Sequence, residues 1–151
     1  DLAAALELGY AGTSHKNCKG VMKGVAHRCL LQHLNHTKRT DRYRMSGEDL
    51  VNIGPVALQQ DLAAQATLGN VTVERNGHHY FRGLSPFPES VNMAMLELHP
   101  DLYVPSKEAP ERGVVARLNV CQGELVLGSI NEAPFGTQVA LPLDQFESLP
   151  L

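Results

Sequence analysis

The chain has 151 residues, of which 43% are hydrophobic, 19% charged and 5% aromatic, and its net charge at neutral pH is −3. This size and composition fit one globular domain with enough apolar material for a core, and they exclude a low-complexity disordered segment, a collagen and a disulfide scaffold. No apolar run approaches the roughly 20 residues that a membrane-spanning helix needs, so a membrane protein is excluded as well.

The charge is divided unevenly along the chain. Residues 1–44 contain eight Lys and Arg against three Asp and Glu, a balance of +5, whereas residues 45–151 contain five against thirteen, a balance of −8. The basic residues are spread over a loop, a helix and a polar link, with no aromatic stacking platform among them apart from Tyr43. This pattern predicts a solvated face and not nucleic-acid binding. Three unpatterned cysteines fit a reducing cytoplasm, which is the expected location.

The first quarter of the chain predicts helix, strand and helix. The chain begins with Asp1 and not with Met, and residues 1–9 are typical of the later turns of a helix that ends at Gly9, without the charged and apolar regions of a signal peptide at this start. We therefore expect the chain to be a piece of a longer protein. Residues 10–15 predict a short strand, and Gly20 then opens a helix. The apolar face of that helix is predicted from its spacing to consist of Met22, Val25, Ala26, Cys29, Leu30 and Leu34.

The middle of the chain predicts two further helices around one strand. Residues 35–44 are polar and predict a loop. The run Ser-Gly-Glu-Asp at 46–49 resembles a capping box, which predicts the start of a turn or short helix. The elements that follow are a helix over 55–69, a short strand over 71–74, a loop over 75–83 and a helix over 88–99.

The last part of the chain changes character. Apolar and polar residues alternate on both sides of a turn at Gln122-Gly123, which predicts a hairpin over 116–129, and Leu143, Phe146 and Leu149 then recur at helical spacing. The earlier strands are separated by helices, and this order implies parallel strands joined by crossovers. Two parallel strands cannot form a sheet covered on both faces, so the strand count also points to a missing partner region.

The densest polar cluster lies at residues 13–20, where the first strand meets its helix. Ligands bind at this end of the strands in parallel α/β architectures. His15 there can act as a general base, and Lys16 and Lys19 lie beside a helix N-terminus that favours an anion. The alternative is a polar loop that caps the helix, and the sequence leaves both interpretations open.

Glu74 ends the second predicted strand in the same sense as His15 ends the first. It is therefore expected at the same rim, where a carboxylate hydrogen-bonds a substrate oxygen; the alternative is a surface glutamate at a strand end. His78 and His79 follow at once, and adjacent residues of an extended segment point opposite ways, so at most one of them faces the site.

Two other chemistries are poorly supported. Cys29, His33 and His36 share one helix face, but no second Cys/His pair completes four zinc ligands, so no metal-ligating residue is predicted. Ser14 and His15 are adjacent in the chain, and adjacent residues rarely reach the geometry of a nucleophile and its base.

Two segments together resemble a known family. Gly12-Thr-Ser-His15 followed by a helix, and Val73-Glu-Arg75 ending the next strand, resemble the last two barrel strands of the mandelate racemase/muconate-lactonising branch of the enolase superfamily. In mandelate racemase-like members a strand-seven Ser-His supplies a catalytic base, and a strand-eight Glu hydrogen-bonds the substrate carboxylate region. The predicted hairpin and the following Ala133-Pro-Phe-Gly136 are similar to the family's C-terminal return toward its capping domain. The stretch between His15 and Glu74 is longer than expected.

The resemblance implies an α/β fold, the C-terminal fragment of a modified TIM (β/α) barrel. Residues 1–105 would form the last strands and helices of the barrel, and residues 106–151 the hairpin and return segment. The implied reaction is abstraction of the proton α to a carboxylate, by a sugar-acid dehydratase (a lyase) or by a racemase or epimerase (an isomerase). Magnesium would stabilise the enediolate through ligands outside this chain, so we expect the isolated chain to be inactive.

The site residues that the resemblance and the spacing imply are, for catalysis, His15, Lys16 and Lys19 and, for substrate binding, Glu74, Ser14 and His78. The expected partners are a small carboxylate substrate, the N-terminal remainder of the enzyme and further copies in a homo-oligomer, without nucleic acid or membrane. The alternative from another class is a self-contained α+β binding domain whose basic N-terminal surface contacts an anionic partner.

Overall fold

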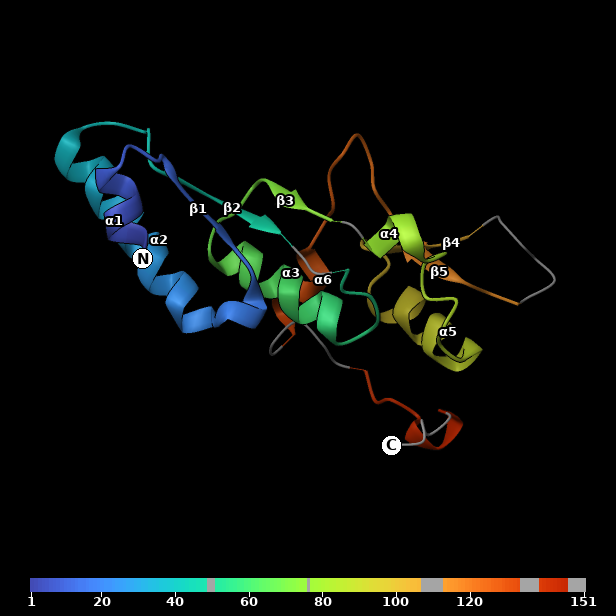
Figure 1. Cartoon of the computed structure of the whole chain (residues 1–151). Coiled ribbons are helices and arrows are strands. Elements are labelled where there is room, and N and C mark those ends of the chain that lie inside the picture. The colour runs from blue at the N-terminus through green and yellow to red at the C-terminus, as the bar shows by residue number, and fades with distance from the viewer. Residues whose placement is uncertain (49–50, 76, 107–112, 134–138, 147–151) are drawn as a thin grey trace. The chain divides into compact units, whose positions relative to one another are not determined.

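The computed structural model describes residues 1–48, 51–75, 77–106, 113–133 and 139–146 (Figure 1). They belong to two compact units. The N-terminal unit comprises residues 1–50 and 64–75, and the C-terminal unit comprises 51–63 and 76–151. The chain therefore passes between the units at 50/51, 63/64 and 75/76, and neither unit is one continuous segment.

A three-stranded parallel sheet organises the N-terminal unit. Its strands β1 (Gly12–His15), β2 (Arg44–Glu48) and β3 (Val73–Glu74) lie in the order β1-β2-β3. The register places His15 beside Gly47, and Glu48 beside Glu74. Because all three strands are parallel, their carboxyl ends meet at one edge of the sheet. The helical elements of this unit are α1 (Leu2–Glu7), the 3₁₀ turn η1 (Asn17–Lys19), α2 (Val21–Lys38) and the last turn of α3 (Ala57–Thr67).

Strand β2 includes residues 46–48, which the capping-box pattern assigns to a turn or short helix, so this prediction is wrong there. Gly12 to His15 of β1 pair with Arg44 to Gly47 of β2, and this hydrogen bonding to a neighbouring strand outweighs the local cap pattern. Asp49 lies outside the described residues. The same strand accounts for the long stretch between His15 and Glu74: the strands that end in these residues are not neighbours, contrary to expectation, because β2 lies between them.

Helix α2 is longer than predicted, and its predicted apolar face is confirmed in part, because Val25, Leu30 and Leu34 pack against the core. Residues 35–38, predicted as loop, continue the helix to Lys38. The chain is then held at the start of β2 by Asn35, whose amide donates to the carbonyl of Tyr43 (2.7 Å) and accepts from its N–H (3.0 Å). Gly24 and Leu31 are buried, whereas Met22 of the predicted apolar face is 78% exposed. Gly24 lies on the buried side of α2, because a residue without a side chain leaves room for the imidazole of His15 in β1.

The core of the N-terminal unit is small and consists of aliphatic side chains and one tyrosine. Its buried residues are Leu2, Leu31, Tyr43, Met45 and Leu68. Each fully buried Leu or Met contributes about 1.5–3 kcal/mol relative to an exposed one, so these side chains hold α1 and α2 on the sheet. Helix α1 ends as predicted at Gly9, whose φ of +100° suits glycine.

The C-terminal unit combines short helices with a two-stranded antiparallel sheet. Its elements are α4 (Gly77–Tyr80), α5 (Glu89–Leu98), β4 (Tyr103–Pro105), β5 (Ala116–Leu118), α6 (Gly128–Glu132) and the 3₁₀ turn η4 (Leu143–Gln145), together with the first turns of α3. The predicted helix over 88–99 is confirmed, with Pro88 and His99 as its caps. Helix α4 lies inside the segment 75–83, which was predicted to be loop without helix.

The hairpin predicted over 116–129 is largely wrong. Strand β5 pairs with β4, with Tyr103 opposite Leu118, and not with a returning strand. Around the turn at Gln122-Gly123 the pairing is one isolated bridge between Cys121 and Glu124, and residues 128–132 form α6. β5 is held in place instead by β4 and by buried groups of the unit. The Ala116 N–H donates a hydrogen bond to Asn92, and the Ala116 carbonyl accepts one from the Leu84 N–H.

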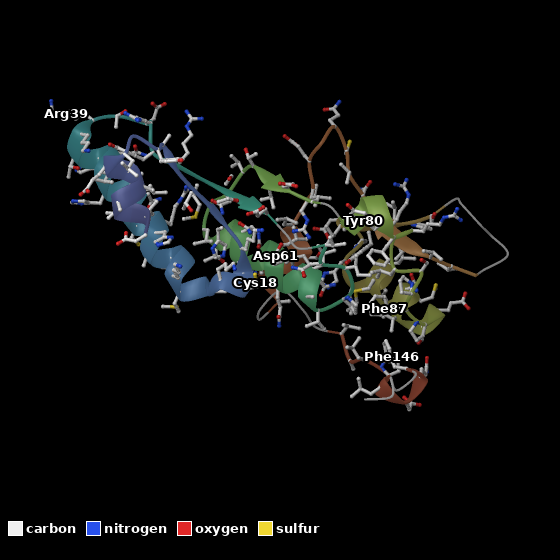
Figure 2. All side chains as sticks on the ribbon, in the orientation of Figure 1. Cys18, Arg39, Asp61, Tyr80, Phe87 and Phe146 are labelled. Atoms are coloured by element: carbon white, nitrogen blue, oxygen red, sulfur yellow. The ribbon has the colours of Figure 1, made fainter. Side chains whose placement is uncertain are left out.

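The core of the C-terminal unit consists of Leu58, Leu62, Leu84, Val91, Met95, Leu102, Tyr103, Ala116 and Ile130. Phe146 joins it at the edge, where its ring meets Phe87 at 6.1 Å in a T-shaped contact (Figure 2). Leu149, the last residue of the predicted terminal helix, lies outside the described residues.

Over the described part of the chain, the fold is mixed α/β with a small parallel sheet and a small antiparallel sheet, and no closed barrel is formed. The complete barrel and the division at 105/106 stay predictions. In the same residues, no helix has both the length and the apolar character to cross a bilayer.

Candidate functional site

The register of the parallel sheet sorts its side chains onto two faces. His15 and Gly47 are partners in register, and both face helices: a Cβ on Gly24 of α2 would lie 2.5 Å from the His15 ring, and a Cβ on Gly47 would overlap the Gln65 side chain of α3. Met45, two residues before Gly47, lies in the core on this same face. One face of the sheet is therefore the helix-covered face.

The opposite face, here called the open face, carries polar side chains. Because side chains alternate along a strand, Ser14 and Ser46 lie on it, and Glu48 and Glu74 follow at the carboxyl edge. Lys16, directly after β1, joins them, since its Nζ lies 3.2 Å from Oε1 of Glu48. The structure thus brings two predicted residues, Lys16 and Glu74, to the same edge and the same face as Glu48.

This edge presents the ammonium of Lys16 beside the carboxylate of Glu48, with Glu74 on the next strand, at a position where ligands can reach them. The side chains of Lys16 and Glu48 are 27% and 29% exposed. A half-exposed ion pair contributes about 0–1 kcal/mol to stability, so the fold does not require it. An ammonium group offers three donors to a carboxylate ligand, and a glutamate accepts from a ligand hydroxyl.

Sequence reasoning missed Glu48 because it missed β2. The signal was present as period-two alternation: Met45 and Gly47 are buried, whereas Ser46 and Glu48 between and after them are half-buried. The alternation is short and lacks β-branched residues, so the capping-box pattern at 46–49 determined the prediction instead.

His15 occupies a different environment from Lys16. It is 5% exposed, and its ring lies between β1, η1 and α2 on the helix-covered face. Its Nε2 lies 2.8 Å from Oδ1 of Asn17, and its carbonyl accepts from Nε2 of Gln65 (3.4 Å). These contacts fix the end of β1 and the turn into α2. The ring therefore lies on the opposite face of the sheet from Lys16.

The remaining predicted residues are not gathered at this edge in the same way. Lys19, at the end of η1, and Ser14 are exposed. The backbone of His78 is part of α4 in the C-terminal unit, and its side chain is not among those that the structure describes. Cys18, in the turn between β1 and α2, is exposed (Figure 2).

A cavity of about 420 Å³ lies near the start of β1. It is lined by residues of α1, β1 and α2, namely Asp1, Leu2, Ala5, Gly12, Thr13, Lys23 and His27. Burial lowers the pKa of His27, and the charges of Lys23 and His15 lower it further. A neutral imidazole is thereby favoured beside the cavity.

In the C-terminal unit, His99, Asp101 and Ser129 form a separate polar cluster. The Ser129 hydroxyl donates to Asp101 and lies 2.9 Å from Nδ1 of His99, and the Ser129 N–H donates to the same carboxylate (3.0 Å). The hydroxyl lies between the imidazole and the carboxylate, whereas a catalytic triad needs the imidazole in the middle. The cluster instead caps the start of α6 and ties it to the end of α5.

The described residues do not fit a magnesium site. Among them, no group of three or more His, Cys, Asp or Glu side chains is placed to hold a metal ion. Glu48 and Glu74 are two carboxylates, and the ammonium of Lys16 beside Glu48 opposes a cation. No chemical step is therefore routed through a metal, and the ligand set that the resemblance assigns to earlier strands stays a prediction.

Comparison with known proteins identifies no relative: no protein-family model, no curated protein and no solved structure matches the chain. The function is consequently argued from the geometry of the carboxyl edge, beside the resemblance of the short motifs.

Proposed function

We propose that the chain is the C-terminal part of an enolase-superfamily enzyme that abstracts the proton α to a carboxylate, a sugar-acid dehydratase or a racemase or epimerase. The observation that carries this proposal is the grouping of Lys16, Glu48 and Glu74 at the carboxyl edge of three parallel strands, on the face turned away from the helices.

The difference between the helix-covered face and the open face of the sheet supports the proposal of a barrel. In (β/α) barrels, helices cover the outer face of the sheet, and catalytic side chains project from the carboxyl ends of several strands. Parallel sheets are normally covered on both faces. The open face here, with Ser14 and Ser46 leading to the charged edge, corresponds to the inner face of such a barrel, which further strands would complete.

The residues at the edge have distinct roles in the proposed reaction. Lys16 either binds the substrate carboxylate or removes the α-proton; the C–H electron pair then moves into the carboxylate as an enediolate. Return of a proton to the opposite face gives the epimer, and loss of a protonated β-hydroxyl as water gives the dehydrated product. Glu74 accepts a hydrogen bond from a substrate hydroxyl, and Glu48 positions Lys16.

The geometry favours Lys16 over His15 for contact with the substrate. The imidazole of His15 is held on the helix-covered face against Gly24, whereas Lys16 belongs to the open face with Glu48. We therefore assign His15 a positioning role at the end of β1. Its role as the acid or base, which the motif resemblance implies, is the competing assignment.

The test is exchange of the α-proton of sugar acids with deuterated solvent, followed by NMR in the full-length protein. We expect Lys16→Met to lower the exchange rate about 10²–10⁴-fold, the usual contribution of a positioned acid or base. Lys16→Arg keeps the charge but transfers protons poorly, so it should keep KM and lose kcat if Lys16 is the base, and keep both if it only binds the carboxylate. The matched control is Lys23→Met, another lysine of the N-terminal unit.

Other outcomes contradict the proposal. If no sugar acid in a broad panel exchanges its α-proton, the reaction class is wrong. If Lys16→Met leaves exchange at the parental rate and His15→Gln abolishes it in a folded protein, His15 is the base. The 151-residue chain alone is expected to be inactive, and turnover of a sugar acid by this chain would overturn its assignment as a fragment.

A further inference from the structure

A basic and apolar surface lies at the opposite edge of the parallel sheet from Lys16 and Glu48. It consists of residues that precede β1 and of residues that precede or begin β2, and it is here called the amino-edge surface; its members are Leu8, Tyr10, Lys38, Arg39, Arg42 and Arg44. Backbone and side-chain bonds hold its segments together, since the Arg44 N–H donates to Ala11 (2.8 Å) and the Arg42 guanidinium donates to the carbonyl of Gly9 (2.6 Å).

The cations of this surface are concentrated by the turn between α2 and β2. Residues 38–44 contain four cations and one acid, Asp41. The Nζ of Lys38 donates to the Tyr43 hydroxyl (2.9 Å), and Lys38 and Arg42 lie 5.2 and 5.9 Å from the centre of its ring. Arg39 lies at the tip of the turn (Figure 2). This packing gathers like charges, which an anionic partner would stabilise.

Exposed apolar side chains accompany these charges. Leu8 and Tyr10, which precede β1, are 81% and 65% exposed. Single exposed apolar residues are ordinary, but two together beside a cluster of cations are typical of a contact surface. The surface therefore fits a partner that is both acidic and apolar.

The chain itself carries a surface of that complementary kind. On α5, Glu89, Met93 and Glu97 follow one another at spacings of four, so they form one stripe along the helix, and all three are exposed. Met93 is 50% exposed at the centre of this stripe. The stripe belongs to the acidic part of the chain, residues 45–151, whose balance is −8 against +5 for residues 1–44.

We propose that the amino-edge surface of one copy of this chain binds the α5 stripe of a second copy. The contact joins two different surfaces, so it is heterologous, and it either closes into a ring or repeats. Complementary charge supplies the orientation, and the apolar side chains on both surfaces supply burial. This inference does not depend on the proposed reaction, because the amino-edge surface lies at the opposite end of the strands from the carboxyl edge.

The test is sedimentation velocity of the chain at about 100 μM, at low and at high salt. Raising the ionic strength from about 0.05 M to about 0.5 M shortens the screening length from about 14 Å to about 4 Å. We expect association at low salt and at least about a tenfold weaker association at high salt. Arg39→Glu/Arg44→Glu should be monomeric at both. The matched control, Arg82→Glu/Arg117→Glu, alters net charge equally at exposed positions of the C-terminal unit and should associate like the parent.

Exchanging the charges gives the decisive experiment. Met93→Lys/Glu97→Lys should also be monomeric; Glu89 is left unchanged because it accepts a hydrogen bond from the Val114 N–H. A mixture of this variant with Arg39→Glu/Arg44→Glu presents opposite charges again and should associate. The proposal is overturned by a parent chain that is monomeric at low salt, by a control that dissociates as completely as the arginine variant, or by a mixture that stays monomeric.

Discussion

At the scale of single residues, the contact between His15 and Gly24 determines how α2 lies on the sheet. The imidazole occupies the space that a side chain at position 24 would fill, and its Nε2 is held 2.8 Å from Asn17. His15 at the end of β1 thus packs against α2, whereas the side chain of the next residue, Lys16, lies on the open face of the sheet. Two adjacent residues serve structure and chemistry separately because side chains alternate along the strand.

Replacing Gly24 with Ala should destabilise the N-terminal unit. The added Cβ would lie 2.5 Å from Cε1 and 2.6 Å from Nδ1 of His15. Overpacking of this kind costs about 1–3 kcal/mol, which exceeds the gain of up to about 1 kcal/mol in helix propensity. Urea unfolding measures the change. In a His15→Ala background the clash is removed, so the same substitution should be neutral or stabilising; an equal loss in both backgrounds would refute the contact.

Stability should fall as the pH drops below about 6.5. Burial lowers the pKa of His99 below its ordinary value of 6.5, although the charge of Asp101 opposes the shift. The unfolded chain therefore binds a proton before the folded chain does, so the stabilisation is complete above 6.5 and is lost as the pH falls toward the lowered value. His27, whose pKa is also lowered, acts in the same direction.

Urea midpoints measured between about pH 7.5 and about pH 5.5 test this dependence. His99→Gln cannot titrate, so its midpoint should fall less steeply than that of the parent, with the remaining slope due to other groups such as His27. Burial raises the pKa of Asp101, but its hydrogen bonds with Ser129 and with the backbone outweigh burial and lower this pKa, so Asp101 does not contribute in this window. Equal slopes for parent and variant would contradict the assignment.

The candidate site was only partly predictable from single residues. Lys16 and Glu74 could be found because each follows or ends a recognisable strand, and parallel strands bring their carboxyl ends together. Glu48 was not found, because the period-two alternation of its strand is short and the capping-box pattern outweighed it. The orientation of His15 depends on the glycine of another element, and no local pattern encodes it.

At the scale of elements, sequence patterns predicted helices that carry their own start and stop residues. They failed for strands whose formation depends on pairing with a segment distant in the sequence. Helix α5 was predicted from Pro88 and from an apolar face of Val91, Met95 and Leu98; Val91 and Met95 are buried, whereas Leu98 is exposed. The strands β4 and β5 were not predicted as partners, because the sequence between them contains no short hairpin-turn pattern such as Asn-Gly or Asp-Gly. The turn at Gln122-Gly123 is real, but its pairing extends to one bridge.

Asn92 is the side chain that joins these elements. It is 2% exposed; its amide donates to the carbonyls of Leu84, Phe87 and Pro88, and its carbonyl accepts from the Ala116 N–H (2.8 Å). Asn92→Ala removes these four side-chain bonds; the carbonyls of Leu84 and Pro88 keep backbone N–H donors, whereas the Phe87 carbonyl and the Ala116 N–H lose this partner, so the substitution should cost about 2–4 kcal/mol by thermal or urea unfolding.

Ser90→Ala, an exposed position on the same helix, is the control for Asn92→Ala and should change stability by less than about 0.5 kcal/mol. Asn92→Asp keeps the acceptor for Ala116 but loses the donors and buries a charge, so it should be no more stable than the alanine variant. If Asn92→Ala unfolds at the parental midpoint, the network does not hold the unit together.

At the scale of the whole molecule, the chain is divided differently from what its length suggests. A length of 151 residues fits one domain, yet the described residues form two units that share helix α3, with residues 57–63 in one and 64–67 in the other. Composition and charge could not reveal this division, because the core positions Leu58 and Leu62 and the buried Gln65 belong to one uninterrupted helical pattern.

Interrupting α3 should therefore damage both units. Ala63→Pro removes an internal hydrogen bond and distorts the preceding turn, at a cost of about 3 kcal/mol or more, whereas Ala63→Gly at the same position costs about 1 kcal/mol. We expect the proline variant to lose amide-exchange protection in β1 and β2 as well as in α5, and the glycine variant to keep it. Protection that survives unchanged in either unit of the proline variant would show that the helix is not shared in folding.

The close contacts of the glycines in the parallel sheet have an evolutionary consequence. A side chain at position 12 would overlap the carbonyl of Arg44, one at position 24 the ring of His15, and one at position 47 the amide of Gln65. Substitution at any of these sites forces a neighbour or the backbone to move, so selection should hold them fixed while surface positions diverge. The spacing Gly12, His15, Gly24, Gly47 and Gln65 is therefore the pattern by which distant relatives of this chain should be recognisable.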